Sequence, residues 1–511
     1  MSDWTAGYLA DIDYTFGYYE ELNPLRTKLA FLNDGLVPPQ IGTACELGFG
    51  QGLSVNIHAA ASDCIWEGTD FNPAQAGFAK SMAGGCGSKA KLYDQAFAEF
   101  ANRADLPEFD YIGIHGIWSW ISNENRAVLV DFVRRKLKVG GVLYISYNTQ
   151  PGWAAMAPMR DLLVEHAATL GAKGNGIINR IEGALTFADK LITTNPQYAR
   201  VNPLVAGRLE ELKKKNRNYL AHEYFNRDWL PMSFSHMADW LEPAKLNYAC
   251  SAYYLDHIDA LNLSSEQLAL LKDIPDPMFR QTVRDFCVNQ QFRRDYWVKG
   301  ARILCVLEQK EALREQRLIL IQPRADVSLK VKGALGEAKM LEEIYGPILD
   351  VLADHKPKKI VEIEKAVNDK NIGFSKLLQS VMVLVGSGKL QAVQEEKITI
   401  KAKAITDKLN LNLMDKARGS RDINHLASPV TGGGVAVSFF QQLFLLAMRQ
   451  DKKQPQEWAQ FVWQILEAQG QKLVKEEKKL ETVEENLAEL NERAMVFAEK
   501  QLPILKGLQI V

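Results

Sequence analysis

The feature that most constrains the fold is a glycine-rich turn, Glu46-Leu-Gly-Phe-Gly-Gln-Gly52, which lies between a β-like run and a helical run. The residues before it, 41–45, are IGTAC, and those after it, 53–61, have a helical pattern. Glycine is needed there because the turn is tight and a Cβ would collide with a ligand lying across it. A strand, a glycine turn and a helix in this order predict the first unit of an α/β sheet with a ligand site at its edge.

The same alternation continues through the first third of the chain. Strand-like runs are followed by stretches long enough for a helix, and these runs are Ile41–Leu47, Cys64–Thr69, Asp110–Ile114 and Gly141–Ser146. Strands that are separated by helix-length segments form parallel βαβ units. We therefore expect residues 1–158 to form an α/β domain with a Rossmann-like, doubly wound sheet.

The rest of the chain predicts mostly helical domains. Residues 159–330 form a helical region, in which residues 219–254 are rich in aromatic side chains. Residues 331–405 predict three helices and then two β-like runs around Gly386-Ser-Gly388, an order typical of a winged helix. Residues 406–511 form a C-terminal helical region. Its last segment predicts an amphipathic helix packed on its own domain or, alternatively, a dimer seam, because apolar residues recur there at heptad spacing: Leu473, Leu480, Leu487 and Ala494.

Composition excludes several classes of protein. A net charge of −1 gives no overall attraction to nucleic acid or to an anionic membrane. The N-terminus lacks the basic and apolar segments of a secretory signal, and the most apolar late stretch, Val435–Met448, is too short to span a bilayer. The six cysteines include no CxxC pair, which argues against a zinc site or a disulfide framework. We expect a cytoplasmic protein with no metal, no membrane span and no nucleic-acid partner.

Acidic and aromatic side chains follow the second and third strands. Asp70 ends the second strand, where its carboxylate is placed to accept hydrogen bonds from both hydroxyls of a ribose. Phe71 is placed to lie against an adenine face. Asp94, at the end of the third strand, is expected to accept from the adenine amino group, and Phe97 to close the base pocket. Together these residues predict a nucleoside site.

The glycine spacing distinguishes between nucleoside ligands. It is GxGxG, whereas a dinucleotide pyrophosphate accompanies GxGxxG, and no GxxxxGK[ST] P-loop is present. S-adenosylmethionine (SAM) has no phosphate, so its carboxypropyl and ribose groups fit across the shorter turn. Single residues have structural explanations, such as Asp70 with Asn72-Pro73 as a turn and helix cap. As an ordered set after successive strands they favour SAM.

Aromatic side chains gather where the fourth and fifth strands end. The fourth strand leads into His115-Gly-Ile-Trp118-Ser-Trp120, and the fifth into Tyr147–Trp153. Ligands lie at the carboxyl ends of parallel strands, so these residues are expected to border the transferred methyl group. Of Trp118 and Trp120, which are two positions apart, only one is expected to face the pocket. Tyr14, Tyr18 and Tyr19 precede the sheet and are expected to fold over it as a lid. No residue stands out as a general base, and His115 is equally suited to a structural role.

Five segments together resemble a known family: YTFGYYEELNPLR, ELGFGQG, GTDFNP, HGIWSWIS and SYNTQPGW. They are similar to the bacterial methyltransferases that carry a methyltransferase regulatory domain, among them the rickettsial-type protein lysine methyltransferases, which modify outer-membrane surface proteins. The similarity covers the N-terminal 155 residues, and residues 219–300 resemble the regulatory domain. The C-terminal third is similar only in general layout.

The resemblance implies a Rossmann-like SAM domain, further helical domains that shape a substrate cleft, and a homodimer. Carried over by motif, the residues that would bind SAM are Tyr14, Glu46, Gly48, Gly50, Asp70, Phe71, Asp94 and Phe97. Tyr18 would close on the cofactor with Tyr14. His115 and Trp118 would line the methyl-transfer end, and the product would be S-adenosylhomocysteine.

The function favoured by these observations is protein lysine N-methylation, because a small-molecule enzyme would not need such long additional domains. A methyltransferase for a small metabolite or a cell-surface sugar is the alternative. A SAM-sensing regulator that binds nucleic acid is disfavoured, since the expected third helix of the winged helix carries only Lys376 as a cation. His222-Glu223 with His236 lacks the HExxH spacing of a metal site and is expected to be structural.

Overall fold

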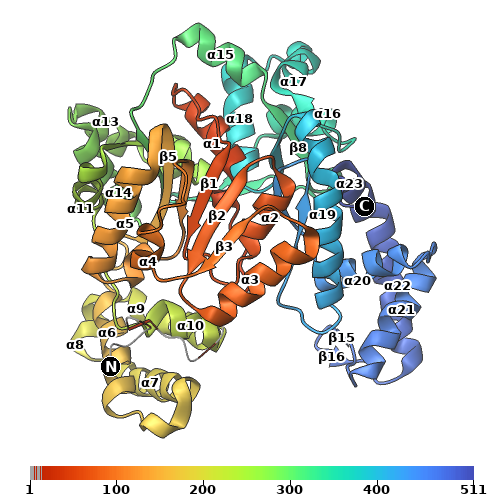
Figure 1. Cartoon of the computed structure of the whole chain (residues 1–511), viewed down its shortest axis with the longest axis horizontal. Coiled ribbons are helices and arrows are strands. Elements are labelled where there is room, and N and C mark those ends of the chain that lie inside the picture. The colour runs from red at the N-terminus through yellow and green to blue at the C-terminus, as the bar shows by residue number, and fades with distance from the viewer. Residues whose placement is uncertain (1–4, 6, 9–11, 13) are drawn as a thin grey trace.

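The computed structural model describes residues 5, 7, 8, 12 and 14–511, so most of the acidic N-terminal stretch lies outside the described residues. The fold is organised around a seven-stranded sheet in the order β3-β2-β1-β4-β5-β7-β6 (Figure 1). Its strands are β1 (Thr43–Leu47), β2 (Ile65–Asp70), β3 (Lys91–Asp94), β4 (Phe109–Ile114), β5 (Leu137–Asn148), β6 (Leu246–Ser251) and β7 (Phe292–Lys299). Neighbouring strands are parallel except at β7, which is antiparallel to both β5 and β6. This arrangement confirms the expected α/β class.

Two strands of this sheet come from far along the chain, and the sequence did not predict them. β7 pairs with β5 from Val142↔Val298 to Asn148↔Phe292, so β5 is not an edge strand. The charges of β7 are typical of an exposed segment. In the fold Arg293 is buried because it forms ion pairs with Asp285 at 2.6 Å and Asp295 at 2.9 Å. The sheet domain therefore extends to Lys299 and does not end at residue 158.

Side chains along the strands alternate between two apolar layers, one on each face of the sheet. Ala44, Tyr111 and Tyr144 lie in the layer shared with α1 (Pro24–Asn33), α2 (Leu53–Ala61) and α3 (Pro73–Cys86). The opposite layer includes Cys45, Ile112 and Leu143 and is covered by α4 (Phe97–Ala101), α5 (Asn123–Lys136) and α11 (Phe234–Leu241). Next to α11 lies α14 (Pro277–Val288). The sheet is therefore buried on both faces, as parallel sheets require.

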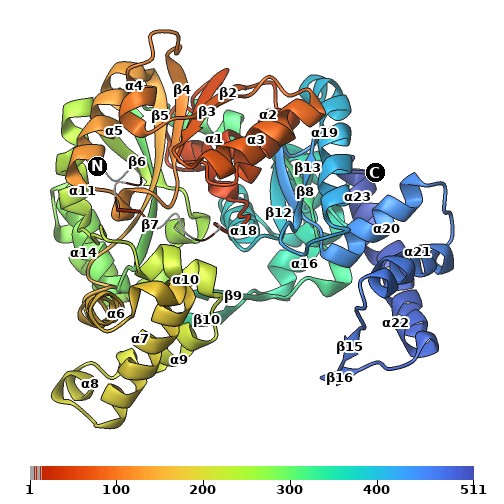
Figure 2. The same cartoon turned by 60° about the horizontal axis from the view of Figure 1, so that its bottom comes forward.

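Between β5 and β6 the chain forms a helical arm that projects away from the sheet (Figure 2). Its helices are α6 (Ala157–Thr169), α7 (Gly176–Thr193), α8 (Gln197–Val201), α9 (Leu204–Lys213) and α10 (Arg217–Tyr224). They enclose an apolar core of their own, which includes Trp153, Leu163 and Leu209. The helical region expected after residue 158 is therefore an insertion into the sheet domain.

The segment after β7 has the helix order expected of a winged helix, but its elements extend beyond the expected bounds, residues 331–405. Its helices are α16 (Glu342–Val351), α17 (Ile360–Ala366) and α18 (Phe374–Gly386). They pack with a three-stranded sheet in the order β11 (Lys358–Lys359), β8 (Arg317–Leu320) and β12 (Leu390–Val393). The central strand β8 precedes residue 331, and α19 (Glu396–Lys416) runs past residue 405. Both expected boundaries therefore fall inside the observed units.

Shorter elements connect these units. Before β7 these are η5 (Tyr254–His257), α12 (Asp259–Asn262) and α13 (Ser265–Asp273), and after it α15 (Val306–Arg314), β9 (Lys330–Gly333) and β10 (Gly336–Lys339). The chain ends with β13 (His425–Ser428), β14 (Gly433–Ala436), α20 (Phe439–Arg449), α21 (Pro455–Ala468), β15 (Val474–Lys475), β16 (Lys478–Lys479), α22 (Val483–Val496) and α23 (Leu502–Gly507). α19 lies along α2 and α3, so the C-terminal region packs directly on the sheet domain (Figure 1).

The last amphipathic helix is shorter than its heptad pattern predicts. α22 begins after Thr482, whose hydroxyl accepts from Glu485 N and caps the helix. Leu473 and Leu480 instead flank a hairpin that turns at Glu476 and Glu477, which both have positive φ. Leu490 is buried in the C-terminal apolar core, in agreement with a helix that packs on its own domain. No helix in the described part of the chain is long and apolar enough to cross a membrane.

Candidate active site

The glycine turn has the conformation that its sequence predicts. Gly48, Gly50 and Gly52 have φ values of 74°, 58° and 71°, a region that disfavours any residue with a side chain. A Cβ at Gly50 would also lie 3.1 Å from Tyr14 Cδ1. Glycine therefore gives the turn its shape and keeps its outer surface open to the lid.

Asp70 supports this turn from the next strand. Its Oδ2 accepts a hydrogen bond from Gly50 N at 2.8 Å, and its Oδ1 accepts from Asn72 N at 3.0 Å. Burial raises the pKa of Asp70 to about 7, although the two backbone donors act in the opposite direction. The carboxyl thus lies at the cavity wall as a strong acceptor that is mostly withdrawn from water.

Glu46 is a second buried acid beside the turn. Its side chain lines the cavity, and Oε2 has no hydrogen-bond partner among the described residues. Burial and, to a smaller extent, the charge of Asp70 raise the pKa of Glu46 to about 8. An unpartnered polar atom is costly inside a protein, so this oxygen is suited to a ligand that brings a donor or a positive charge.

These groups open into one cavity of about 1030 Å³, its mouth included. Of the residues predicted to bind the cofactor, Tyr14, Glu46, Gly48, Gly50, Asp70, Phe71 and Phe97 line it. Asp94 does not: it is exposed at the end of β3, and the cavity is lined instead by the next residue, Gln95. Side chains alternate along a strand, so a shift of one position changes the face that the side chain occupies.

The tryptophan that faces the cavity is Trp120, not Trp118. Trp118 is buried in the opposite apolar layer, where its Nε1 donates to Met232 Sδ at 3.3 Å and its ring packs against Trp240. Trp120 lines the cavity, and its Nε1 donates to Glu223 O at 3.1 Å. The two residues lie in a 3-10 turn, whose geometry directs side chains two positions apart in different directions.

The lid is formed by Tyr14 and Tyr19, whose hydroxyl oxygens lie 3.4 Å apart. Tyr18 is turned away: its hydroxyl is hydrogen-bonded to His58 Nε2 at 3.0 Å, and its ring packs against His425. The backbone at Tyr19 is extended, with φ −116° and ψ 104°, so the side chains of Tyr18 and Tyr19 point to opposite sides. Tyr18 therefore joins the lid segment to the C-terminal region, and Tyr19 occupies the place at the cavity that Tyr18 was expected to take.

His115 lines the cavity as predicted, but its ring is firmly held. Its Nδ1 lies 2.7 Å from the Tyr144 hydroxyl, and its ring stacks on Tyr19 with centroids 3.9 Å apart. Burial lowers the pKa of His115 to about 4, so the imidazole is neutral at physiological pH. This environment positions Tyr19 and gives His115 little capacity to take up a proton.

Comparison with known proteins agrees with this geometry. Residues 216–299 match a family model described as a predicted methyltransferase regulatory domain. The uncharacterized protein sll1526 of Synechocystis is 40% identical over 512 aligned residues that cover 99% of each chain. The structure of PKMT2 from Rickettsia typhi in complex with AdoHcy superposes with a TM-score of 0.68 at 16% identity, covering 97% of this chain and 99% of PKMT2. The chain belongs to the methyltransferases that carry this regulatory domain. A more distant relative is RP789 of Rickettsia prowazekii, 25% identical over 55% of this chain and 51% of its own.

The PKMT2 structure contains AdoHcy, the demethylated form of SAM, and the cavity of this chain has groups that suit SAM. The glycine turn leaves room that suits the amino-acid part of SAM, and Asp70 presents a carboxyl that suits its ribose. Glu46 Oε2 is the unpartnered acceptor beside the same turn. Phe71, Phe97 and Ile117 line the cavity with apolar surface that suits an adenine base.

The regulatory domain contributes two strands to the sheet and one acidic residue beside the cavity. β6 and β7 lie within residues 216–299, and so does Glu223 on α10. Glu223 is half-buried, and burial raises its pKa to about 7. Its charge lies close enough to the cavity to raise the pKa values of Tyr8, Tyr14 and Tyr19. Sequence reasoning considered Glu223 only as a metal ligand, because nothing local indicates that α10 reaches the cavity.

The position of Gln95 leads to a test of how the methyltransferase holds the adenine. We expect Gln95→Ala to weaken S-adenosylhomocysteine binding by roughly 2- to 10-fold, the effect of one hydrogen bond to the adenine amino group. Asp94→Ala is expected to change the affinity by less than about twofold, since Asp94 lies outside the cavity lining. Isothermal titration calorimetry of both variants measures this difference. A larger loss of affinity in Asp94→Ala than in Gln95→Ala would show that Asp94, and not Gln95, contacts the adenine.

Proposed function

We propose that this methyltransferase transfers a methyl group from SAM to the side-chain amine of a lysine in a protein substrate. The observation that carries the proposal is the position of Glu223, a half-buried carboxylate beside the tyrosines of the cavity. Among the residues that the structure describes, no side chain forms a hydrogen bond or an ion pair with this carboxylate. Its charge is therefore suited to a cation that enters from outside.

The aromatic walls beside Glu223 support the same acceptor. Tyr14, Tyr19 and Trp120 line the cavity, and Tyr8 packs at its edge against Phe71 and His222. Faces of aromatic rings attract ammonium groups by about 0.5–2 kcal/mol each, depending on desolvation. Aromatic side chains beside a carboxylate are matched to the long apolar stem and charged end of lysine.

The extra domains support a macromolecular substrate. The helical arm and the C-terminal region flank the sheet domain on different sides (Figure 2). PKMT2 from R. typhi, whose structure was determined with AdoHcy, has this same multidomain fold over 97% of the present chain. A small metabolite would be enclosed by the sheet domain and lid alone, so these domains are suited to contacts with a folded or extended chain.

The proposed chemistry needs little from the protein beyond alignment, exclusion of water and removal of one proton. When bound, SAM supplies a methyl group on a positively charged sulfur. The lysine amine first loses a proton to the Glu223 carboxylate, which passes it to solvent. The nitrogen then attacks the methyl carbon, so that the N–C bond forms as the C–S bond breaks and its electron pair stays on sulfur. His115 and Tyr144 hold Tyr19 over the reacting groups.

The test is incubation of the purified protein with methyl-labelled SAM and a cell extract. We expect label in protein bands and, after acid hydrolysis, in methylated lysine. Label in the low-mass fraction would favour the small-metabolite alternative, and label in other amino acids would contradict lysine as the acceptor. The homodimer and the cytoplasmic location expected from the sequence stay predictions.

A further inference from the structure

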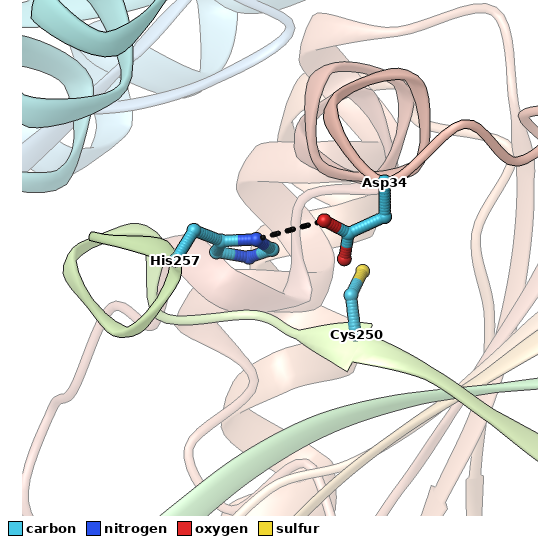
Figure 3. Close-up of side chains that lie close together, drawn as sticks. All are labelled: Asp34, Cys250 and His257. Carbon is cyan, nitrogen blue, oxygen red and sulfur yellow. Dashed lines mark hydrogen bonds and ion pairs between the residues drawn. The ribbon is translucent and has the colours of Figure 1, made fainter. Parts of the chain in front are cut away.

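A second cluster of ligating side chains lies away from the cofactor cavity, where α1 meets the regulatory domain. Asp34 is the C-terminal cap of α1, Cys250 lies on β6 and His257 ends η5 (Figure 3). One ligating atom of each residue lies within 4.8 Å of the other two. All three line a separate cavity that is bounded by β6, α13 and α14. The cluster thus combines a carboxylate, a thiol and an imidazole at one accessible point.

The orientation of His257 is the first reason to regard the cluster as a site. His257 Nε2 lies 2.8 Å from the carbonyl oxygen of Ser251, so in the neutral ring Nε2 carries the proton and donates it there. Nδ1 then presents its lone pair toward Asp34 Oδ1, 3.3 Å away. In metal sites a ligating histidine almost always donates its other ring N–H to a carbonyl or a carboxylate in this way.

The second reason is the sulfur of Cys250. The residue is only 2% exposed and belongs to the apolar core, yet its sulfur lies beside the Asp34 carboxylate (Figure 3). An ion pair between Asp34 and protonated His257 is the arrangement that needs no metal, and in it Asn33 Nδ2 donates to Asp34 Oδ1 at 3.1 Å. In that arrangement the Cys250 thiol is a hydrogen-bond partner of Asp34, and its sulfur adds a third kind of ligand atom at the same point.

We propose that Asp34, Cys250 and His257 bind a divalent transition metal of the zinc type. Zinc accepts this set of ligands at about 2.0–2.3 Å, which places ligand atoms roughly 3.3–3.7 Å apart on a tetrahedron. The observed spacing reaches this value by small side-chain rotations. On binding, the S–H bond of Cys250 breaks, a metal–sulfur bond forms and the proton passes to solvent. Water from the adjoining cavity completes the coordination.

Such a metal would fasten the N-terminal helix to the regulatory domain. α1 directly follows the lid segment, whereas Cys250 and His257 belong to residues 216–299. The same junction already contains a hydrogen bond from the Tyr254 hydroxyl to Arg26 O. The metal would therefore stabilise the connection between lid and regulatory domain without touching the methyl-transfer cavity.

The experiment uses the full-length protein, freed of metal by a chelator and then given one equivalent of Zn²⁺ or Co²⁺. We expect about one metal ion per chain after gel filtration, and a thiolate-to-cobalt charge-transfer band in the near ultraviolet. Cys250→Ser is expected to abolish that band, and His257→Gln to lower metal content at least about tenfold. Cys86→Ser, which changes an equally buried cysteine on α3, is the matched control and is expected to bind like the parent.

Circular dichroism and S-adenosylhomocysteine binding show whether each variant is folded. A parent protein that retains no Zn²⁺, or a Cys250→Ser variant that keeps the charge-transfer band and full metal content, would overturn the proposal. If Cys250→Ser fails to fold, Asp34→Asn provides the same comparison at an exposed residue. None of these measurements uses methyl transfer, so the result is independent of the function proposed above.

Discussion

Replacing Asp70 with alanine is expected to raise the Kd for S-adenosylhomocysteine at least about 100-fold. This carboxyl accepts from Gly50 N and Asn72 N, and in the complex with the ligand it is expected to accept from the ribose hydroxyls as well. Hydrogen bonds to a charged acceptor contribute about 1.5–3 kcal/mol each, and 1.4 kcal/mol corresponds to a factor of ten in affinity. Loss of two such bonds accounts for the expected change, which isothermal titration calorimetry measures.

The controls for this prediction separate cofactor binding from folding. Asp70→Ala leaves two backbone donors unpaired, the buried Gly50 N and the part-buried Asn72 N, and a buried unpaired donor costs about 1–3 kcal/mol. Asp70→Asn keeps one acceptor, so the turn is expected to persist while the affinity still falls. Asp94→Ala, at the position paired with Asp70 in the sheet, is the matched change of an acid that does not line the cavity. Near-normal affinity in a folded Asp70→Ala variant would contradict the site described here.

Replacing Glu223 with glutamine is expected to lower kcat/KM for a lysine-containing protein about 100-fold. Glutamine has nearly the same shape but neither attracts an ammonium group nor accepts its proton, and positioned bases contribute about 10²–10⁴-fold to rates. The Kd for S-adenosylhomocysteine is expected to stay within about twofold, since Glu223 is not part of the cavity wall that holds the cofactor. Glu211→Gln, an exposed change on α9 of the same helical arm, is the control and is expected to leave kcat/KM unchanged.

The pH dependence of this reaction provides a second readout for Glu223. Burial raises the pKa of this carboxyl to about 7, so it is neutral below that pH and charged above it. Only the charged form binds the ammonium group and accepts its proton, so kcat/KM is expected to rise with pH through about 7. In Glu223→Gln this rise should disappear, whereas the rise at higher pH caused by deprotonation of free lysine should remain. An unchanged profile would show that Glu223 has no part in the reaction.

The parts of the site that were predictable are those set by local sequence. Gly48, Gly50 and Asp70 lie where they were expected because a tight turn and the end of a strand have local signatures. Errors of one or two positions occurred where the chain leaves a regular element. Trp120 replaces Trp118 in a 3-10 turn, and Gln95 replaces Asp94 at the end of a short strand. At such points the direction of a side chain depends on the twist of the backbone and not on the residue type.

The sequence by itself determined the class of sheet, the cofactor turn and the acid beside it, since hydrophobic period and turn chemistry act over only a few residues. Only the tertiary structure decided which distant segments add strands to the sheet and side chains to the site. β7 joins the sheet because Arg293 is neutralised by Asp285 and Asp295, and Glu223 reaches the tyrosines because the helical arm returns to the sheet. Asp34 lies close to Cys250 and His257 because α1 packs against the segment that contains β6 and η5. Contacts between residues more than 100 positions apart depend on the packing of whole elements, which leaves no local pattern in the sequence.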